Sequence, residues 1–320
     1  MTMAATPHLA AGGFAFQSDD AWAKIPDGFQ YPEVAGVATD DDDNVYVFNR
    51  GPHPVIVLDK NGNFLRSWGE GFYGGRAHGI TVSPDGFVYC VENTRHSIEK
   101  YTRAGELVWT LGDAGNPTPK WSQNPFNLPT HMAISARTGD IYVGDGYGNN
   151  AIHRFSAEGK LLKTWGGHGI EPGSFQCPHN LCLDEDDYVY VADRENNRIQ
   201  VFDRDGNLEA IWHDIYRPSA MAFYNGQIYV GELLHDPHPL LQDCTTLGHR
   251  LSIFSKNGRL IARLGSEVEG DGPGEFIAPH GIDVDSQGNV YVAEVSFTEK
   301  GRRLEKTFTS LRRLKNVAST

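Results

Sequence analysis

Histidine is the residue type whose spacing in this sequence could support metal chemistry. The chain has 13 histidines in 320 residues, and four of them, His78, His131, His179 and His280, stand at the same place in a repeated segment. Imidazoles that are neutral near pH 7 are common ligands of zinc and similar divalent metals. Three histidines with an open position form a catalytic site, whereas four protein ligands form a closed, structural one. The sequence therefore predicts a divalent-metal site, with three or all four of these histidines as ligands.

The repeated segment predicts the elements that carry the histidines. Each copy has a short apolar strand, a turn containing Asp, Asn or Gly, and a second strand ending at an acidic residue or Asn. The six copies begin at Val34, Ala77, Thr130, Pro178, Pro218 and Pro279. A second unit, two strands joined by a glycine turn as in VIVLDKNGNFLRSWG (55–69), occurs five times between them. Four strands in a period of roughly 45 residues are the signature of a β-propeller blade.

The two ends of the chain are predicted to complete the last blade. FTSLRRL (308–314) can supply its third strand and GFAFQSDDAWAKI (13–25) its fourth, which would close the ring and remove an open sheet edge. We predict an all-β, six-bladed β-propeller over residues 13–314, with a flexible N-terminus at 1–12 and a tail at 315–320. The stretches 112–127 and 234–249 are predicted to be long loops.

In a propeller, the residues that enter the innermost strands face one another around the central axis. The sequence predicts that these are Ala35, His78, His131, His179, Ser219 and His280. One histidine in a repeat is usually a structural, hydrogen-bonded group, but four at one repeat position are harder to explain that way. The acids that end the second strands are expected to be mostly solvated: Glu92, Asp145, Asp193 and Glu294.

Charge and cysteine content limit the classes of partner and compartment. The formal net charge of −13 argues against nucleic acid and anionic membranes as partners. The first residues lack the basic and apolar regions of a secretory signal, and the four cysteines form no CxxC pair. We expect a cytoplasmic protein; the oligomeric state is left open. Cys177 and Cys182 flank His179 and are expected to be buried rather than to act as extra metal ligands.

Several motifs carry a resemblance to a known family. The run FNLPTHMAISARTGDIYVGDGYGNNAIHRF (126–155), followed by FQCPHNLCL and VADRENNRIQVF, resembles the NHL-repeat propellers. Within them it is most similar to the peptidyl-α-hydroxyglycine α-amidating lyases. The resemblance implies zinc on His78, His179 and His280, a catalytic Tyr147 in DGYxN, Arg50 and Arg194 at the substrate, and a structural calcium near the axis.

The sequence departs from this family at three positions that matter. His131 stands where the family usually has Asp and offers a fourth imidazole. Gly281 replaces an aspartate that helps to hold the calcium, and Ala278 replaces a methionine that lines the substrate site. The calcium and the identity of the substrate are therefore open.

The leading hypothesis is a zinc lyase acting on a small substrate whose hydroxylated carbon is bonded to nitrogen. Tyr147 would move a proton, and Arg50 and Arg194 would hold a carboxylate. A hydrolase or hydratase could use the same residues. The other candidates are a non-enzymatic NHL propeller that binds a protein and, more remotely, a calcium-dependent lactonase-type propeller.

Each chosen residue also has a structural interpretation. Arg194 could form a salt bridge with Glu195 or Asp145, whereas Tyr147 and Arg50 could be ordinary turn residues. Five further histidines are expected in loops, exposed or at the substrate entrance: His53, His96, His168, His235 and His238.

Overall fold

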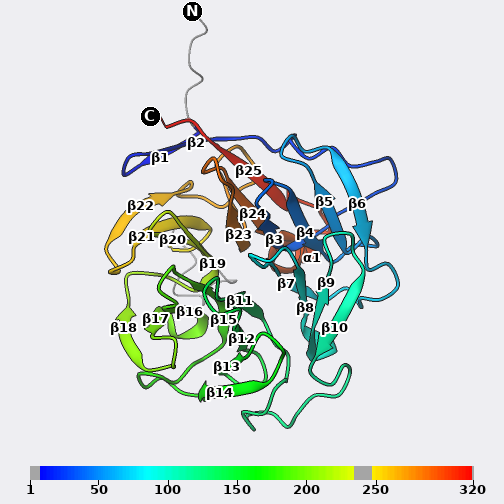
Figure 1. Cartoon of the computed structure of the whole chain (residues 1–320). Helices are drawn as coiled ribbons and strands as arrows, with labels where there is room; N and C mark the ends of the chain where they lie inside the picture. Colours follow the sequence, from blue (N-terminus) through cyan, green and yellow to red (C-terminus); the bar gives the residue numbers. More distant parts are fainter. Residues whose placement is uncertain (1–7, 234–246, 319–320) are drawn as a thin grey trace, which may run out of the picture.

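The computed structural model describes residues 8–233 and 247–318, which form six antiparallel sheets arranged around a central axis (Figure 1). Five sheets have four strands and the sixth has five. The predicted all-β, six-bladed β-propeller is thus confirmed. No helix in the described part of the chain is long and apolar enough to span a membrane.

The first five blades follow one another along the sequence. The first is β3 (Val34–Thr39), β4 (Val45–Asn49), β5 (Val55–Leu58) and β6 (Phe64–Trp68), and the second is β7 (Ala77–Val82), β8 (Val88–Glu92), β9 (Ser97–Tyr101) and β10 (Leu107–Leu111). The third is β11 (His131–Ile134), β12 (Ile141–Asp145), β13 (Ala151–Phe155) and β14 (Leu161–Gly166). The fourth is β15 (Pro178–Leu183), β16 (Val189–Asp193), β17 (Arg198–Phe202) and β18 (Leu208–Trp212). The fifth is β19 (Pro218–Tyr224), β20 (Gln227–Glu232), β21 (Arg250–Ser255) and β22 (Leu260–Leu264).

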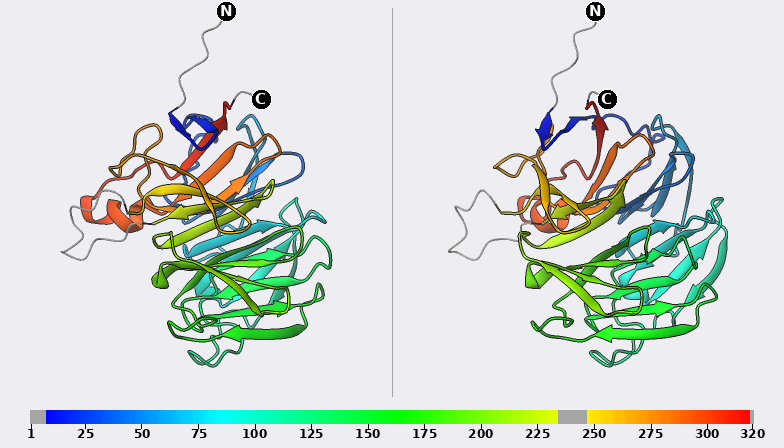
Figure 2. Two further views of the ribbon diagram at one scale, coloured as in Figure 1. Left: turned by 90° about the vertical axis from the view of Figure 1, so that its left-hand side faces the viewer. Right: turned by 60° about the vertical axis from the view of Figure 1, so that its left-hand side comes forward.

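Both chain ends contribute to the sixth blade, as the two colour extremes in Figure 2 show. Its order is β23 (Pro279–Val284), β24 (Val290–Glu294), β25 (Leu311–Asn316), β2 (Phe14–Ser18) and β1 (Leu9–Ala11). The C-terminal strand is third and the N-terminal strand fourth, as predicted. The sheet reaches beyond the predicted limits of 13 and 314, because β1 adds a fifth strand and β25 continues to Asn316.

The acids that end the second strands are buried, so the expectation that they are mostly solvated is wrong. Glu92, Asp145, Asp193 and Glu294 are each 0% exposed. Each carboxylate accepts a backbone N–H from the segment that leads into the innermost strand of its own blade; the donors are Arg76, Asn127, Gln176 and both Ile277 and Ala278, at 2.7–3.0 Å. These bonds fix the segments that precede the axial residues. The acids are therefore part of what positions the site.

Candidate metal centre

Three histidines converge on the axis from alternate blades. His78, His179 and His280 enter the second, fourth and sixth blades, and their ring centroids are 4.6–4.7 Å apart. One nitrogen from each ring lies within 4.8 Å of the others, which is close enough for the three to share one ion. All three side chains are buried, at 0–4% exposure.

A carbonyl from the following blade fixes each ring. Nδ1 of His78 lies 2.6 Å from the carbonyl oxygen of Thr130, and Nδ1 of His179 lies 2.7 Å from that of Ser219. His280 makes the same contact with Ala35, also at 2.7 Å. A carbonyl can only accept a hydrogen bond, so Nδ1 carries the proton in all three rings. Nε2 is therefore left with a free lone pair, the tautomer that a metal needs.

The surroundings keep these imidazoles neutral. Burial is the largest cause, and the Arg194 cation acts in the same direction on all three rings, as Arg50 does on His78 and His280; together they lower the pKa of His78 and His179 well below the usual 6.5 and that of His280 to about 3. Neutral imidazole is the form that binds metal. The donor set therefore suits zinc, which prefers nitrogen and sulfur ligands in a tetrahedral arrangement.

Tyr147 stands directly over this cluster. It follows β12 in the third blade, and its hydroxyl lies 3.0 Å from Nε2 of both His78 and His179. The guanidinium of Arg194 lies 5.6 Å from the centre of the Tyr147 ring. Burial raises the pKa of the Tyr147 phenol, although Arg194 opposes this shift, so the group is protonated at neutral pH.

His131 does not occupy the position that was predicted from the repeat. It pairs with Gly144 in the way that Gly79 pairs with Val91, so it lies one residue further along its strand than His78 does. Thr130 holds the axial position instead. Its hydroxyl lies within hydrogen-bond distance of the carbonyl oxygens of Gly144 and Pro178 and can donate to either one, just as the Ser219 hydroxyl can donate to that of Gly231 or Pro279. The axial ring is therefore Ala35, His78, Thr130, His179, Ser219 and His280.

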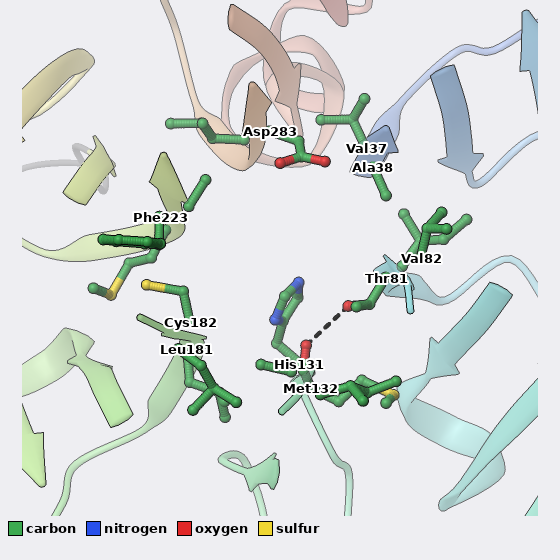
Figure 3. Close-up of a pocket in the computed structure, with 17 residues that line it drawn as sticks. Val37, Ala38, Thr81, Val82, His131, Met132, Leu181, Cys182, Phe223 and Asp283 are labelled. Atoms are coloured by element: carbon green, nitrogen blue, oxygen red, sulfur yellow. Dashed lines mark hydrogen bonds between the residues drawn. The ribbon is translucent and has the colours of Figure 1, made fainter. Parts of the chain in front are cut away.

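His131 instead lines a separate axial pocket of about 230 Å³ (Figure 3). Figure 3 shows its ring and the Asp283 carboxylate reaching into this pocket from opposite sides. Burial lowers the pKa of His131 to about 4 and raises that of Asp283 to about 6. His131 is absent from the group of three histidines found among the described residues. Gly281 supplies no carboxylate, so an axial calcium stays a prediction of the resemblance alone.

Arg50 and Arg194 lie together in a cavity of about 330 Å³ beside the cluster, which we call the arginine cavity. Tyr147 and His280 also line it. Arg50 is held by Glu33 at 2.7 Å and by the Thr298 hydroxyl at 3.0 Å. Arg194 forms the salt bridge with Glu195 that was considered as its structural role, at 2.8 Å, and lines the cavity as well.

Sequence reasoning missed two further arginines of this cavity, Arg76 and Arg217. Arg217 is only 9% exposed; it donates to Glu195 through Nε and Nη2, while its buried Nη1 has no hydrogen-bond partner in the part of the chain that is described. Both residues directly precede an innermost strand, at Ala77 and at Pro218. This shared repeat position was the signal that could have identified them.

The remaining residues singled out in the sequence have mixed placements. His168 is exposed at a second cavity near Tyr147 and His53 stacks on Phe29 with ring centres 3.7 Å apart, whereas His96 is buried rather than exposed. Cys177 and Cys182 are buried, as expected, and burial raises the pKa of the Cys177 thiol to about 11. His235, His238 and Cys244 lie outside the described residues.

Comparisons with known proteins agree with this fold. The NHL repeat profile matches residues 175–202. The mouse NHL repeat-containing protein 3 is 29% identical over 306 residues, covering 88% of this chain and 81% of that protein. The solved streptogramin B lyase superposes with a TM-score of 0.61 at 14% identity, covering 95% of this chain and 98% of that one, which shows the fold alone.

Several relatives carry names of amidating enzymes. The rat peptidylglycine alpha-amidating monooxygenase is 31% identical over 330 residues, covering 89% of this chain and 31% of that protein. The Drosophila melanogaster peptidyl-alpha-hydroxyglycine alpha-amidating lyase 1 is 30% identical over 296 residues, covering 82% of this chain and 51% of the relative. This chain thus spans less than two thirds of either enzyme. By repeat, fold and similarity, the chain is an NHL-repeat β-propeller that resembles the peptidyl-α-hydroxyglycine α-amidating lyases.

Proposed function

We propose that this protein is a zinc-dependent lyase that cleaves the carbon–nitrogen bond of a small α-hydroxyglycine-like substrate. The observation that carries the proposal is the set of three neutral imidazoles within 4.8 Å, with the Tyr147 hydroxyl 3.0 Å from two of their nitrogens. The similarity to the fly lyase supports the same chemistry.

In this proposal the arginine cavity binds the negatively charged carboxylate of the substrate. Arg50 and Arg194 present guanidinium groups next to His280 and Tyr147, and a planar fork of N–H donors suits a carboxylate. The substrate carboxylate would lie there and bring its hydroxylated carbon to the three histidines. A divalent cation held by these nitrogens would lower the pKa of a bound hydroxyl.

Tyr147 is placed to move the protons. The reaction converts an N-acyl-α-hydroxyglycine into glyoxylate and an amide: the hydroxyl oxygen loses its proton, its electrons form the carbonyl, and the carbon–nitrogen bond breaks with its electron pair going to nitrogen. A protonated phenol gives its proton to the departing nitrogen and recovers one from the substrate hydroxyl, so Tyr147 ends in its initial state. No water or oxidant is consumed.

Two other functions are alternatives to this proposal. A hydrolase or hydratase would use the same residues but would incorporate water into its product. The similarity to NHL repeat-containing protein 3, which spans 88% of this chain, favours a non-enzymatic propeller that binds a protein partner as the second candidate. A scaffold of that kind has no need of three converging imidazoles.

The experiment that tests the proposal combines metal content with product analysis. Protein purified without chelator should hold about one zinc per chain, and His78→Ala, His179→Ala and His280→Ala should each lose it. Incubation with an N-acyl-α-hydroxyglycine should release glyoxylate and the amide in equal amounts, as measured by NMR. Protein without stoichiometric metal would refute the catalytic proposal, and release of a carboxylic acid carrying oxygen from ¹⁸O-water in place of the amide would favour the hydrolase.

A further inference from the structure

A second cavity adjoins the arginine cavity on the other side of Tyr147. It measures about 380 Å³, and its own lining residues are Lys120, Trp121, Gly146, Asn150, His168, Gln176 and Cys177. We call it the tryptophan cavity. Tyr147, Arg194 and Glu195 line both cavities. The proposed proton donor therefore stands at the boundary between two spaces of different chemical character.

Trp121 lines this cavity although its own side chain is largely exposed. Its side chain is 56% exposed. Of the other five tryptophans of the chain, four are buried and Trp109 is partly buried. Its backbone has φ +62°, a left-handed conformation that a bulky residue rarely adopts. Large apolar side chains gain free energy by burial, so an exposed one held in a constrained loop is typical of a ligand-binding surface.

Hydrogen bonds attach the loop of Trp121 to the turn that carries Tyr147. The Trp121 N–H donates to the carbonyl of Gly148 at 3.0 Å, and the Asn149 side chain donates to the carbonyl of Asn124 at 2.8 Å. The backbone N–H of Asn127 donates to the buried carboxylate of Asp145. The Trp121 ring is thus positioned relative to Tyr147 by contacts of the chain itself.

The rim of the cavity is aromatic and cationic. The ring of His168 stacks on that of Trp121, with centroids 5.6 Å apart and planes inclined by 26°, and the ammonium group of Lys120 lies 4.7 Å from the Trp121 ring centre. Aromatic rings of this kind pack against flat apolar groups and against other rings.

We propose that the tryptophan cavity binds the N-acyl group of the substrate and that it selects aromatic acyl groups over small ones. This inference rests on the proposed function. In an N-acyl-α-hydroxyglycine the carboxylate and the acylated nitrogen leave the reacting carbon in different directions. A carboxylate in the arginine cavity therefore directs the acyl group past Tyr147 and towards Trp121.

The test compares N-benzoyl and N-acetyl compounds in wild type and three variants. Wild-type kcat/KM for N-benzoyl-α-hydroxyglycine should exceed that for the N-acetyl compound by about tenfold. This ratio should fall to near one in Trp121→Ala and should be largely restored in Trp121→Phe. Phe72→Ala is the matched control, because Phe72 is also an exposed ring beside a cation, that of Arg95, but lines neither cavity, and it should keep the wild-type ratio.

Binding of unreactive ligands separates this inference from the proposed function. N-benzoylglycine and N-acetylglycine lack the hydroxyl, and calorimetry should show the same preference for the benzoyl compound, lost in Trp121→Ala. Benzoyl-selective binding without turnover would refute the lyase but support the subsite. A ratio that Trp121→Ala leaves unchanged, an equal loss in Phe72→Ala, or a wild-type protein that binds neither ligand would overturn the subsite.

Discussion

Removal of the Tyr147 hydroxyl should tighten zinc binding while it slows catalysis. The hydroxyl lies 3.0 Å from Nε2 of His78 and of His179, the nitrogens proposed as ligands. It has one proton and can donate to only one of them at a time, and zinc binding must break that bond. Because a net hydrogen bond contributes about 0.5–1.5 kcal/mol, Tyr147→Phe should raise the zinc affinity by about 2- to 13-fold.

The same substitution should lower kcat by about 10²- to 10⁴-fold, the usual contribution of a positioned proton-transfer group. Zinc affinity is measured by competition with a chromophoric chelator at fixed pH, and kcat by glyoxylate release. Tyr190→Phe is the matched control, because the Tyr190 hydroxyl bonds to Asp184, away from the cluster. Weaker zinc binding in Tyr147→Phe would show that the phenol oxygen is itself a ligand, and an unchanged kcat would exclude it from proton transfer.

Three further predictions concern the metal, the closure of the ring and the axial pocket. His131→Ala should keep its full zinc content by elemental analysis, and loss of the metal would contradict the ligand set. Arg312→Met should lower the free energy of unfolding in urea by about 3–5 kcal/mol, because it leaves the fully buried Glu294 unpaired. Arg313→Met breaks a partly exposed pair with Asp19 and should lower it by only about 0–1 kcal/mol. Equal losses in the two variants would refute this prediction. The pKa of Asp283 is raised from 3.8 to about 6 in the folded state, which favours its protonated form. The stabilisation of the folded state by this proton is present below pH 4 and is lost as the pH rises through 6, by about 3 kcal/mol. Asp283→Asn should remove that part of the pH dependence of urea unfolding, and superimposable profiles of wild type and variant would contradict the prediction.

The repeat made the blades predictable, and the same repeat misplaced one residue. Strand order and ring closure follow from periodic apolar segments and from the need to pair the last sheet edge. The letters THMA (130–133) and AHGI (77–80) align on their histidines, but the pairing of His131 with Gly144 puts Thr130 at the axis. Register depends on pairing between strands, which similarity of letters does not encode.

Nonlocal partners explain the other differences. Asp193 looks like a polar strand end in the sequence, yet it is buried because the Gln176 N–H and the Arg198 guanidinium reach it from other segments. Arg217 is similar: its neighbours in the sequence do not indicate a cavity, and its place beside Arg194 results from the docking of the fifth blade against the fourth. The repeat position of Arg217 could mark it as a candidate, but its contacts are defined only when adjacent blades are in place.

The carbonyl contacts at the axis have a consequence for the number of blades. Each histidine is oriented by the main chain of the blade that follows it, at Thr130, Ser219 or Ala35, so ligand blades and supporting blades alternate around the ring. Strict alternation on a closed circle needs an even count. Duplication or loss of one blade would place two ligand blades or two supporting blades side by side, so this centre can change its blade number only by pairs.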